Sequence, residues 1–337
     1  MSVAPAAELP APRGRAAHPI LELIVRRTLL GVLTLVLVSM LVFLATQVLP
    51  GNAAYAVLQN TATPARIHAL EVQLHLNAPV TEQYWRWITG VLKGNLGTSL
   101  ASGQSVSSLI GSRIVNSAVL VVIAGLISTA LGVVLGVWAA AQRDRWPDHA
   151  LSLVALTLAA LPEFVVAIAL IIIFSTIVFH LLPSVSIVPP GDSPLSHPNL
   201  LILPVATLVL VTVPYTFRMA RGATAEALES DYVEMATLKG VSRRRVLFVH
   251  ALLNATAATV QVVGLNLLYL AGGIVVVEYV FNYPGLGQGL VSAVSDRDIP
   301  VVQFIVLLLA GFYVFINIAS DVLALAVTPR RRLPRSG

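Results

Sequence analysis

An uninterrupted apolar run near the start of the chain reads LLGVLTLVLVSMLVFLATQV, from Leu29 to Val48. A helix rises about 1.5 Å per residue, so about 20 apolar residues are enough to cross the hydrocarbon core of a membrane. Five more segments pass this test, and the six predicted spans are Leu29–Val48, Val115–Ala141, Ala150–Phe179, Leu200–Ala220, Leu252–Val277 and Val301–Val327. The runs lack the period-two alternation of an outer-membrane barrel. The sequence therefore predicts an all-α integral membrane protein with six transmembrane helices.

The composition of the chain also favours a membrane protein. Of its 337 residues, 57% are hydrophobic and only 11% are charged, whereas about a quarter of the residues in an ordinary soluble domain are charged. The 21 basic and 16 acidic side chains are too few to cover a soluble protein of this length. The chain contains no cysteine, which excludes disulfide bonds, thiolate metal sites and cysteine nucleophiles.

The basic residues are distributed unevenly along the chain. Sixteen of the 21 Lys and Arg residues lie before the first predicted span, in or beside the second and fourth connections, or after the last span. Cytoplasmic loops carry an excess of positive charge, so both termini are predicted to be cytoplasmic in a multi-pass protein of the plasma (inner) membrane. Residues 1–25 are expected to form a flexible cytoplasmic tail, residues 26–328 the transmembrane domain, and residues 329–337 a basic cytoplasmic tail.

A long extracytoplasmic loop, residues 50–113, is predicted between the first two spans. It contains two helical patterns, an amphipathic one over Arg66–Leu76 and a shorter one over Gln83–Leu92. The second pattern carries the aromatic residues Tyr84, Trp85 and Trp87. Aromatic rings suit the headgroup region of a membrane. The loop is therefore either an interfacial cap or a docking surface for an external partner.

The connection between the fourth and fifth spans, residues 221–250, contains the sequence DYVEMATLKG from Asp231 to Gly240. It predicts a short helix with one shared face, formed by Tyr232, Met235 and Ala236. Gly240 is placed to end this helix in the left-handed conformation. A second helix is expected to open with the basic residues Arg243, Arg244 and Arg245. Anionic lipid or an acidic patch on a cytoplasmic partner would compensate these cations, and the short amphipathic helix beside them favours the partner.

The same connection ends in the sequence HALLNA, from His250 to Ala255. Together with DYVEMATLKG, it resembles the cytoplasmic coupling loop of ABC-importer permeases, in particular the B-type subunit of the dipeptide, oligopeptide and nickel family. Similar stretches follow in family order from Arg26 to Val327: Leu49–Gly51, Gly94–Ser99, Pro162–Phe164, Leu203–Pro204, Glu278–Gly287 and Arg297–Gln303. Asn52 and Asn95 depart from the pattern, because the family usually has Asp at both positions.

The resemblance implies the fold of a type I ABC importer (MetI-like) permease, paired with a second homologous permease subunit. It also implies two cytoplasmic ATPase subunits that bind ATP and Mg, and an extracytoplasmic substrate-binding protein that docks on the outer loops, including Asn282 and Tyr283. Membrane lipid is a further expected partner, and nucleic acid is not. The residues expected to couple the chain to the ATPases are Glu229, Asp231, Tyr232, Glu234, Met235, Ala236, Lys239, Gly240, Arg243, Arg244 and Arg245.

The cargo implied by the resemblance is short peptides, with nickel or another small solute as the alternative in the same class. The sequence has no GxxxxGK[ST] phosphate-binding loop, so a separate subunit must supply ATP hydrolysis. Its scattered histidines form no zinc or protease pattern, and we expect no catalytic residue, metal site or cofactor in this chain. A gradient-coupled secondary carrier is the less favoured alternative.

Few polar or ionisable side chains lie inside the predicted spans. Glu163 lies in the third span beside Pro162, and we expect it to line the pathway or support the structure rather than to carry protons. Asp321, in the last span, is the second acid, and neither acid has a predicted basic partner in the membrane. The fifth span carries Asn254, Gln261 and Asn266. These amides either join helices by hydrogen bonds or form a polar wall along the pathway.

Overall fold

The structure is a computed structural model that describes residues 19–48, 63–65, 68, 78–189, 191–241 and 252–327. Within these residues the regular structure is helical, apart from one isolated bridge between Thr98 and Ser105. The helices are α1 (Pro19–Val48), α4 (Val80–Leu92), α5 (Val106–Ala141), α6 (Trp146–Ala160), α7 (Glu163–Ile171), α8 (Pro198–Leu228), α9 (Asp231–Leu238), α11 (Leu252–Val280), α12 (Leu286–Ser295) and α13 (Ile299–Val327). A π-helical turn, Ile172–Thr176, extends α7, and a 3-10 turn, Pro194–Ser196, precedes α8.

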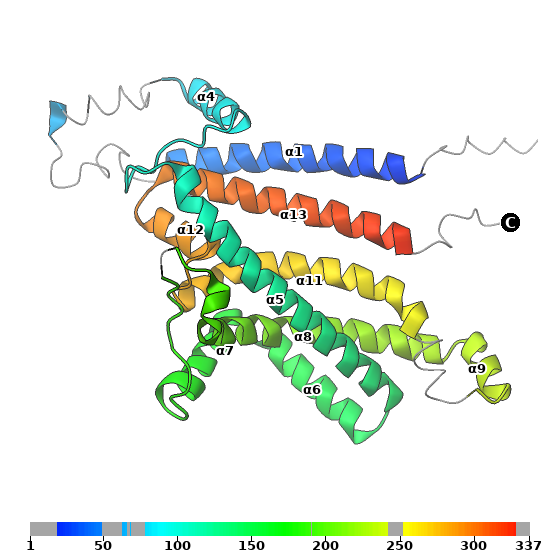
Figure 1. Cartoon of the computed structure of the whole chain (residues 1–337). Helices are drawn as coiled ribbons and strands as arrows, with labels where there is room; N and C mark the ends of the chain where they lie inside the picture. The colour runs from blue at the N-terminus through cyan, green and yellow to red at the C-terminus, as the bar shows by residue number, and fades with distance from the viewer. Residues whose placement is uncertain are drawn as a thin grey trace, which may run out of the picture.

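The long helices lie side by side, with α8 inside the bundle and α1 at one edge (Figure 1). α8 contacts α5, α6, α7 and α11, whereas α1 contacts α13, which in turn contacts α11. The start of α1, the end of α13 and the short helix α9 lie at one end of the bundle, which we call the α9 end (Figure 1). Helices α4 and α12 lie at the opposite end, which we call the α12 end (Figure 1).

Four helical segments of the described chain are long and apolar enough to cross a membrane: Ile24–Val48, Val106–Ala141, Pro198–Leu228 and Ile299–Leu323. Helices α6 and α7 pass the test only as a pair, which would make a fifth span. The remaining predicted span corresponds to α11, of which the segment Asn266–Val280 counts as a shorter apolar helix. The predicted all-helical membrane bundle is confirmed, and the number of six spans stays a prediction.

The third predicted span is not one straight helix. α6 ends at Ala160, and α7 begins at Glu163 after Leu161 and Pro162 in extended backbone. The two helices are bent by 103°. Proline lacks an amide hydrogen and keeps the residue before it out of the helical conformation. The prediction of one continuous helix over Ala150–Phe179 is therefore wrong, and Glu163 opens a new helix; that α6 and α7 together form one span stays a prediction.

Helices α5 and α8 extend beyond their predicted spans and pack closely together. α5 begins at Val106, because the side chain of Ser105 accepts a hydrogen bond from the amide of Ser108 and caps the helix. α5 carries glycine where it meets α8: a β-carbon added at Gly136 would lie 2.7 Å from the carbonyl oxygen of Phe217. Small residues of this kind allow two helix backbones to approach each other in a membrane.

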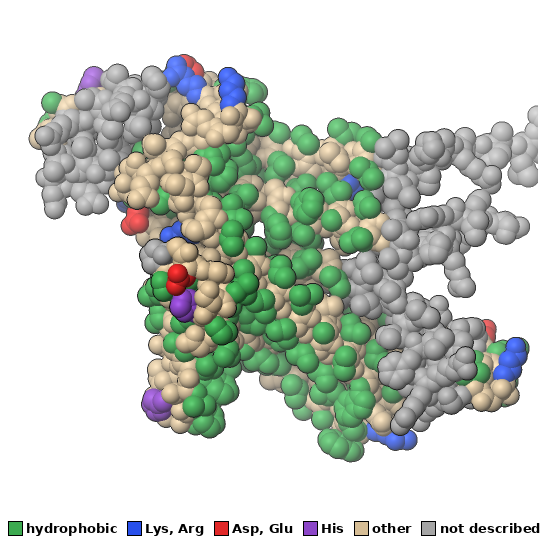
Figure 2. All heavy atoms as spheres, viewed as in Figure 1, with side chains coloured by type: hydrophobic (Ala, Val, Ile, Leu, Met, Phe, Trp, Pro, Cys, Tyr) green, Lys and Arg blue, Asp and Glu red, His purple; other side chains and the backbone are tan. Residues whose placement is uncertain are grey.

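The outer surface of the bundle is mainly apolar along the flanks of the long helices, with charged side chains gathered toward the two ends (Figure 2). On α1, the exposed residues include Leu30, Leu33, Leu37, Leu41 and Leu44. They recur at helical spacing and form one continuous apolar ridge. Such a surface suits lipid chains or another apolar helix rather than water.

Candidate functional site

The predicted coupling loop contains the short helix α9 at one end of the bundle (Figure 1). The amide of Val233 donates to the carbonyl of Ser230 at 2.9 Å, so α9 begins directly after α8. Gly240 has a φ of 80°, and the amide of Val241 donates to the carbonyl of Ala236 at 3.1 Å. The prediction that Gly240 ends the helix in the left-handed conformation is confirmed.

One face of α9 is turned toward its own chain. Val233 and Ala236 are buried and pack against Leu228 and Val241, because the helix folds back on the end of α8. Ala236 is therefore covered by its own chain, and the prediction that it contacts an ATPase together with Tyr232 and Met235 is wrong for Ala236. The spacing of these residues could not reveal this, because it shows which positions share a face but not which face the rest of the chain covers.

The other face of α9 exposes two apolar side chains. Met235 is 56% exposed and Leu238 is 77% exposed, and we call this pair the α9 apolar surface. Asp231, Glu234, Lys239 and Gly240 are exposed around it. The side chain of Tyr232 and the whole of Arg243, Arg244 and Arg245 lie outside the described residues. The described part of α9 thus offers a small apolar surface with charged neighbours.

Two ion pairs hold the turn between α5 and α6 against the end of α8. Arg221 donates from Nε to Oδ1 of Asp148 at 2.5 Å and from Nη2 to Oδ2 at 2.7 Å, and the Asp148 side chain is only 2% exposed. Arg143 pairs with Glu229, the predicted coupling residue between α8 and α9. The pair of Arg221 and Asp148 is bidentate, so it fixes the relative orientation of the two side chains as well as bringing opposite charges together. Asp148 was not predicted as a site residue; its one signal in the sequence is its place as an acid in the first turn of an apolar helix.

A second polar group lies where α7, α8 and α11 meet. The hydroxyl of Tyr269 donates to Oε1 of Glu163 at 2.7 Å. The rings of Tyr269 and Tyr215 have centroids 5.0 Å apart. Glu163 was predicted as a pathway residue, and Tyr215 and Tyr269 were not singled out, because their contact joins residues far apart in the sequence.

Of the three amides predicted on the fifth span, Asn266 has a side chain that the structure describes. Asn266 is buried, and its Nδ2 donates to the hydroxyl of Thr216 on α8. This arrangement matches the interhelical alternative, in which the amide joins two helices. The side chains of Asn254 and Gln261 lie outside the described residues.

A closed hydrogen-bond network joins α5, α11 and α12 at the α12 end. Glu278 is fully buried. Its carboxylate accepts hydrogen bonds from the hydroxyl of Ser117 at 2.6 Å and from the amide of Gly287 at 2.6 Å. Arg113 lies beside this group and donates to the side-chain oxygen of Gln288 at 2.6 Å. Glu278 and Gly287 lie in a stretch that resembles the family, but the network was not predicted, because its residues pair over long distances in the sequence.

The residues predicted to dock a binding protein divide into exposed and buried ones. Trp85 is 64% exposed and Asn282 is exposed. Tyr283 is fully buried and donates to the carbonyl of Asn116 at 2.9 Å. The prediction that Tyr283 contributes to a docking surface is therefore wrong: aromatic character and a loop position did not reveal that this ring is part of the core.

Helix α4, predicted as the short helix Gln83–Leu92, is held against α1 by its aromatic residues. The hydroxyl of Tyr84 lies 2.9 Å from the hydroxyl of Ser39, and the rings of Tyr84 and Trp87 lie 5.4 Å and 5.9 Å from that of Phe43. Trp85 is left facing outward. The helix predicted over Arg66–Leu76 falls largely outside the described residues.

Asp321, the acid in the last span, has a basic partner that was not predicted from the sequence. Nε of Arg27 on α1 lies 2.7 Å from Oδ2 of Asp321 on α13. The expectation that Asp321 lacks such a partner is wrong, because the pairing depends on two helices from opposite ends of the chain. In the described residues, no three His, Asp or Glu side chains gather in a way that could hold a metal ion.

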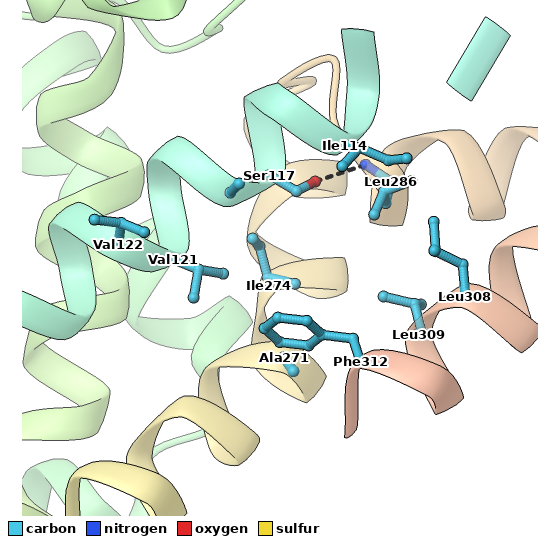
Figure 3. A pocket seen from close by; sticks show the side chains of 11 residues that line it. Ile114, Ser117, Val121, Val122, Ala271, Ile274, Leu286, Leu308, Leu309 and Phe312 are labelled. Atoms are coloured by element: carbon cyan, nitrogen blue, oxygen red, sulfur yellow. Dashed lines mark hydrogen bonds between the residues drawn. The ribbon is translucent and has the colours of Figure 1, made fainter. Parts of the chain in front are cut away.

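An apolar cavity of about 170 Å³ lies between α5, α11 and α13, with Ile114, Ile274 and Phe312 in its wall (Figure 3). Ser117 is the polar side chain among the lining residues. Its hydroxyl already accepts from the amide of Leu286 at 2.8 Å and donates to Glu278. The cavity therefore offers no unused polar group to orient a polar ligand.

Two family models match the chain over almost its whole length. The model described as the inner-membrane component of binding-protein-dependent transport systems matches residues 132–333. The model for the N-terminal part of such membrane components matches residues 20–132.

Similar proteins of full length carry transport names. A peptide transport system permease protein from Brucella abortus is 36% identical over 310 residues, which cover 92% of this chain and 98% of that protein. A glutathione transport system permease protein from Salmonella paratyphi A is 38% identical over 309 residues, covering 91% and 98%. In the solved structures, the inward-facing MetNI methionine ABC transporter matches with a TM-score of 0.53 at 17% identity, over 63% of this chain and 93% of that chain. This likeness confirms the predicted MetI-like permease fold.

Proposed function

Because the chain belongs to the family of inner-membrane components of binding-protein-dependent transport systems, we propose that it is one of two permease subunits of an ATP-driven importer for short peptides. Family membership confirms the resemblance found in the sequence. It also makes the chain a transport subunit rather than an enzyme with its own ATPase site. The peptide cargo is supported by relatives named for peptide and glutathione transport. These names favour neither nickel as the cargo nor a gradient-coupled carrier as the mechanism.

The proposed importer contains four further subunits. A second, similar permease completes the pathway, two ATPases bind ATP and Mg, and a substrate-binding protein delivers the cargo. We place the α9 end in the cytoplasm and the α12 end outside. The uneven distribution of Lys and Arg supports this orientation, and so does the position of α9 at the same end of the bundle as the start of α1 and the end of α13 (Figure 1).

The observation that carries the proposal is the α9 apolar surface. Met235 and Leu238 are exposed on a short helix whose opposite face packs against the described residues Leu228 and Val241. Exposed apolar side chains with charged neighbours are typical of a contact with another protein. On this proposal an ATPase subunit covers them, and its movement reaches α5 and α6 through the ion pair between Asp148 and Arg221.

The orientation is tested by labelling single cysteines, since the natural chain has none. Leu238→Cys and Trp85→Cys replace two exposed apolar side chains, one on α9 and one on α4. A membrane-impermeant maleimide should label the Trp85 variant in intact cells and the Leu238 variant only after permeabilisation. The reverse result would place α9 outside the cell and refute the proposed coupling role.

The coupling role is tested by placing a charge on the α9 apolar surface. Leu238→Asp should abolish most of the capture of ATPase subunits by the detergent-solubilised permease, because the carboxylate would be desolvated in the contact. Leu195→Asp is the matched control, because Leu195 is 61% exposed but lies before α8. Equal capture by both variants would contradict the proposal.

A further inference from the structure

The open face of α8 differs in composition from the outer face of α1. α8 is contacted by α5, α6, α7 and α11. Its exposed residues from the middle of the helix onward are Tyr215, Arg218, Met219, Gly222 and Glu226. The exposed ridge of α1 consists of leucines instead. Arg218 lies at the α9 end of the predicted span Leu200–Ala220 and Glu226 lies beyond it, where charged side chains reach water. The open face of α8 therefore becomes polar toward the α9 end.

The group formed by Glu163, Tyr269 and Tyr215 lies at the start of this open face. Tyr215 is 38% exposed, and its ring lies beside that of Tyr269, whose hydroxyl donates to Glu163. Glu163 is itself partly exposed. Three helices thus bring one carboxylate and two aromatic rings together beside the exposed face of α8.

Within the described residues, one of the two carboxylate oxygens of Glu163 accepts a hydrogen bond. In the described part of the structure, Tyr269 is the donor to Oε1, and Oε2 has no hydrogen-bond partner. No Lys, Arg or His of these residues forms an ion pair with Glu163. Asp321, by contrast, forms an ion pair with Arg27, and the carboxylate of Glu278 accepts hydrogen bonds from several donors. An acid without a cation is costly within a membrane protein unless it meets water or a ligand.

We propose that Glu163, Tyr269 and Tyr215 form a transit site for the ammonium end of the transported peptide. A carboxylate accepts a strong charge-assisted hydrogen bond from an ammonium group, and the faces of two tyrosine rings attract the same cation. A free amino terminus is common to short peptides of any sequence. The site would therefore recognise peptides as a class without selecting their side chains. This inference rests on the proposed peptide cargo.

The test measures ATP-driven uptake of two probes by the complete importer in proteoliposomes. Alanyl-alanine carries the ammonium group, and N-acetyl-alanyl-alanine lacks it; each is supplied at a concentration that saturates the binding protein. Glu163→Gln should lower uptake of the free dipeptide about tenfold and uptake of the acetylated one less than about twofold. Asp192→Asn, the same change on a loop outside this site, should leave both rates unchanged.

A second variant separates recognition from folding. Tyr269→Phe keeps the ring but removes the hydroxyl, so it should change the ratio of the two uptake rates by less than Glu163→Gln does. Equal losses for both probes in Glu163→Gln and Tyr269→Phe, or unchanged uptake of the free dipeptide, would overturn the proposed site. If the natural importer moved neither of the two probes with ATP, the peptide cargo would be refuted, and this site with it.

Discussion

At the α12 end of the bundle, the carboxylate of Glu278 is fully buried and accepts hydrogen bonds from Ser117 and Gly287, whereas at the α9 end the link between Arg143 and Glu229 is exposed, with side chains 45% and 65% accessible. A fully satisfied buried network holds one arrangement. Exposed ion pairs contribute little and are easily exchanged. The comparison indicates a rigid α12 end and an adjustable α9 end, which fits the proposed permease that is driven from its α9 end.

The largest effect is expected at the rigid end. Glu278→Ala removes the acceptor for two buried donors, on Ser117 and Gly287, and removes the negative charge beside Arg113. Buried donors left without partners cost about 1–3 kcal/mol each, so we expect a loss of about 3 kcal/mol in the free energy of unfolding. Thermal unfolding of the detergent-solubilised chain measures this loss.

The matched control for Glu278→Ala is Glu82→Ala on α4. Glu82 pairs with Arg86 at 2.6 Å, but both side chains are about half exposed. A pair of this kind within one helix contributes about 0.3–0.5 kcal/mol. If both variants lowered the unfolding temperature equally, the α12 end would not be the rigid end.

An intermediate effect is expected where the adjustable end meets the bundle. Asp148→Asn removes the charge from the bidentate pair with Arg221 and should lower stability by about 2 kcal/mol, because charge-assisted hydrogen bonds are about twice as strong as neutral ones. It should also reduce peptide uptake per ATP hydrolysed, since this pair ties α8 to α6. The two rates are measured together on reconstituted importer.

A charge exchange tests whether the Asp148 pair itself is responsible. The double variant Asp148→Arg with Arg221→Asp keeps opposite charges in contact, and it should recover part of the uptake per ATP that either single change loses. Additive losses in the double variant would show that the two residues act separately and that this link does not transmit movement.

Local features of this fold could be predicted from the sequence. The apolar runs located most of the helices because a span is a property of about 20 consecutive residues. Gly240 was predicted correctly as the end of α9, since a glycine after a helical pattern needs no distant contact to adopt a positive φ. The break at Pro162 was not predicted, because a proline allows anything from a kink to the 103° bend found here.

The polar contacts depended on distant pairings and were missed. Glu163 was recognised as unusual, but its hydrogen bond to Tyr269 crosses 106 residues. Tyr283 looked like a surface aromatic because it follows a span, and its burial follows from the packing of α11 and α12 against α5. Asp148 was not singled out, because its pairing with Arg221 joins residues 73 positions apart in the sequence. Periodicity shows the face of an element, and only the assembled bundle shows what covers that face.

The smallest effect is expected from the exposed ion pair at the α9 end. Glu229→Gln removes the partner of Arg143, and because both side chains are largely accessible to solvent, the loss of stability should stay below about 0.5 kcal/mol. Any loss of ATPase capture should shrink as salt rises from 50 to about 500 mM, since salt screens exposed charges. Arg143→Gln should have the same small effect on stability and the same salt dependence of ATPase capture. A loss as large as that of Asp148→Asn, or one that salt leaves unchanged, would make the α9 end as rigid as the α12 end.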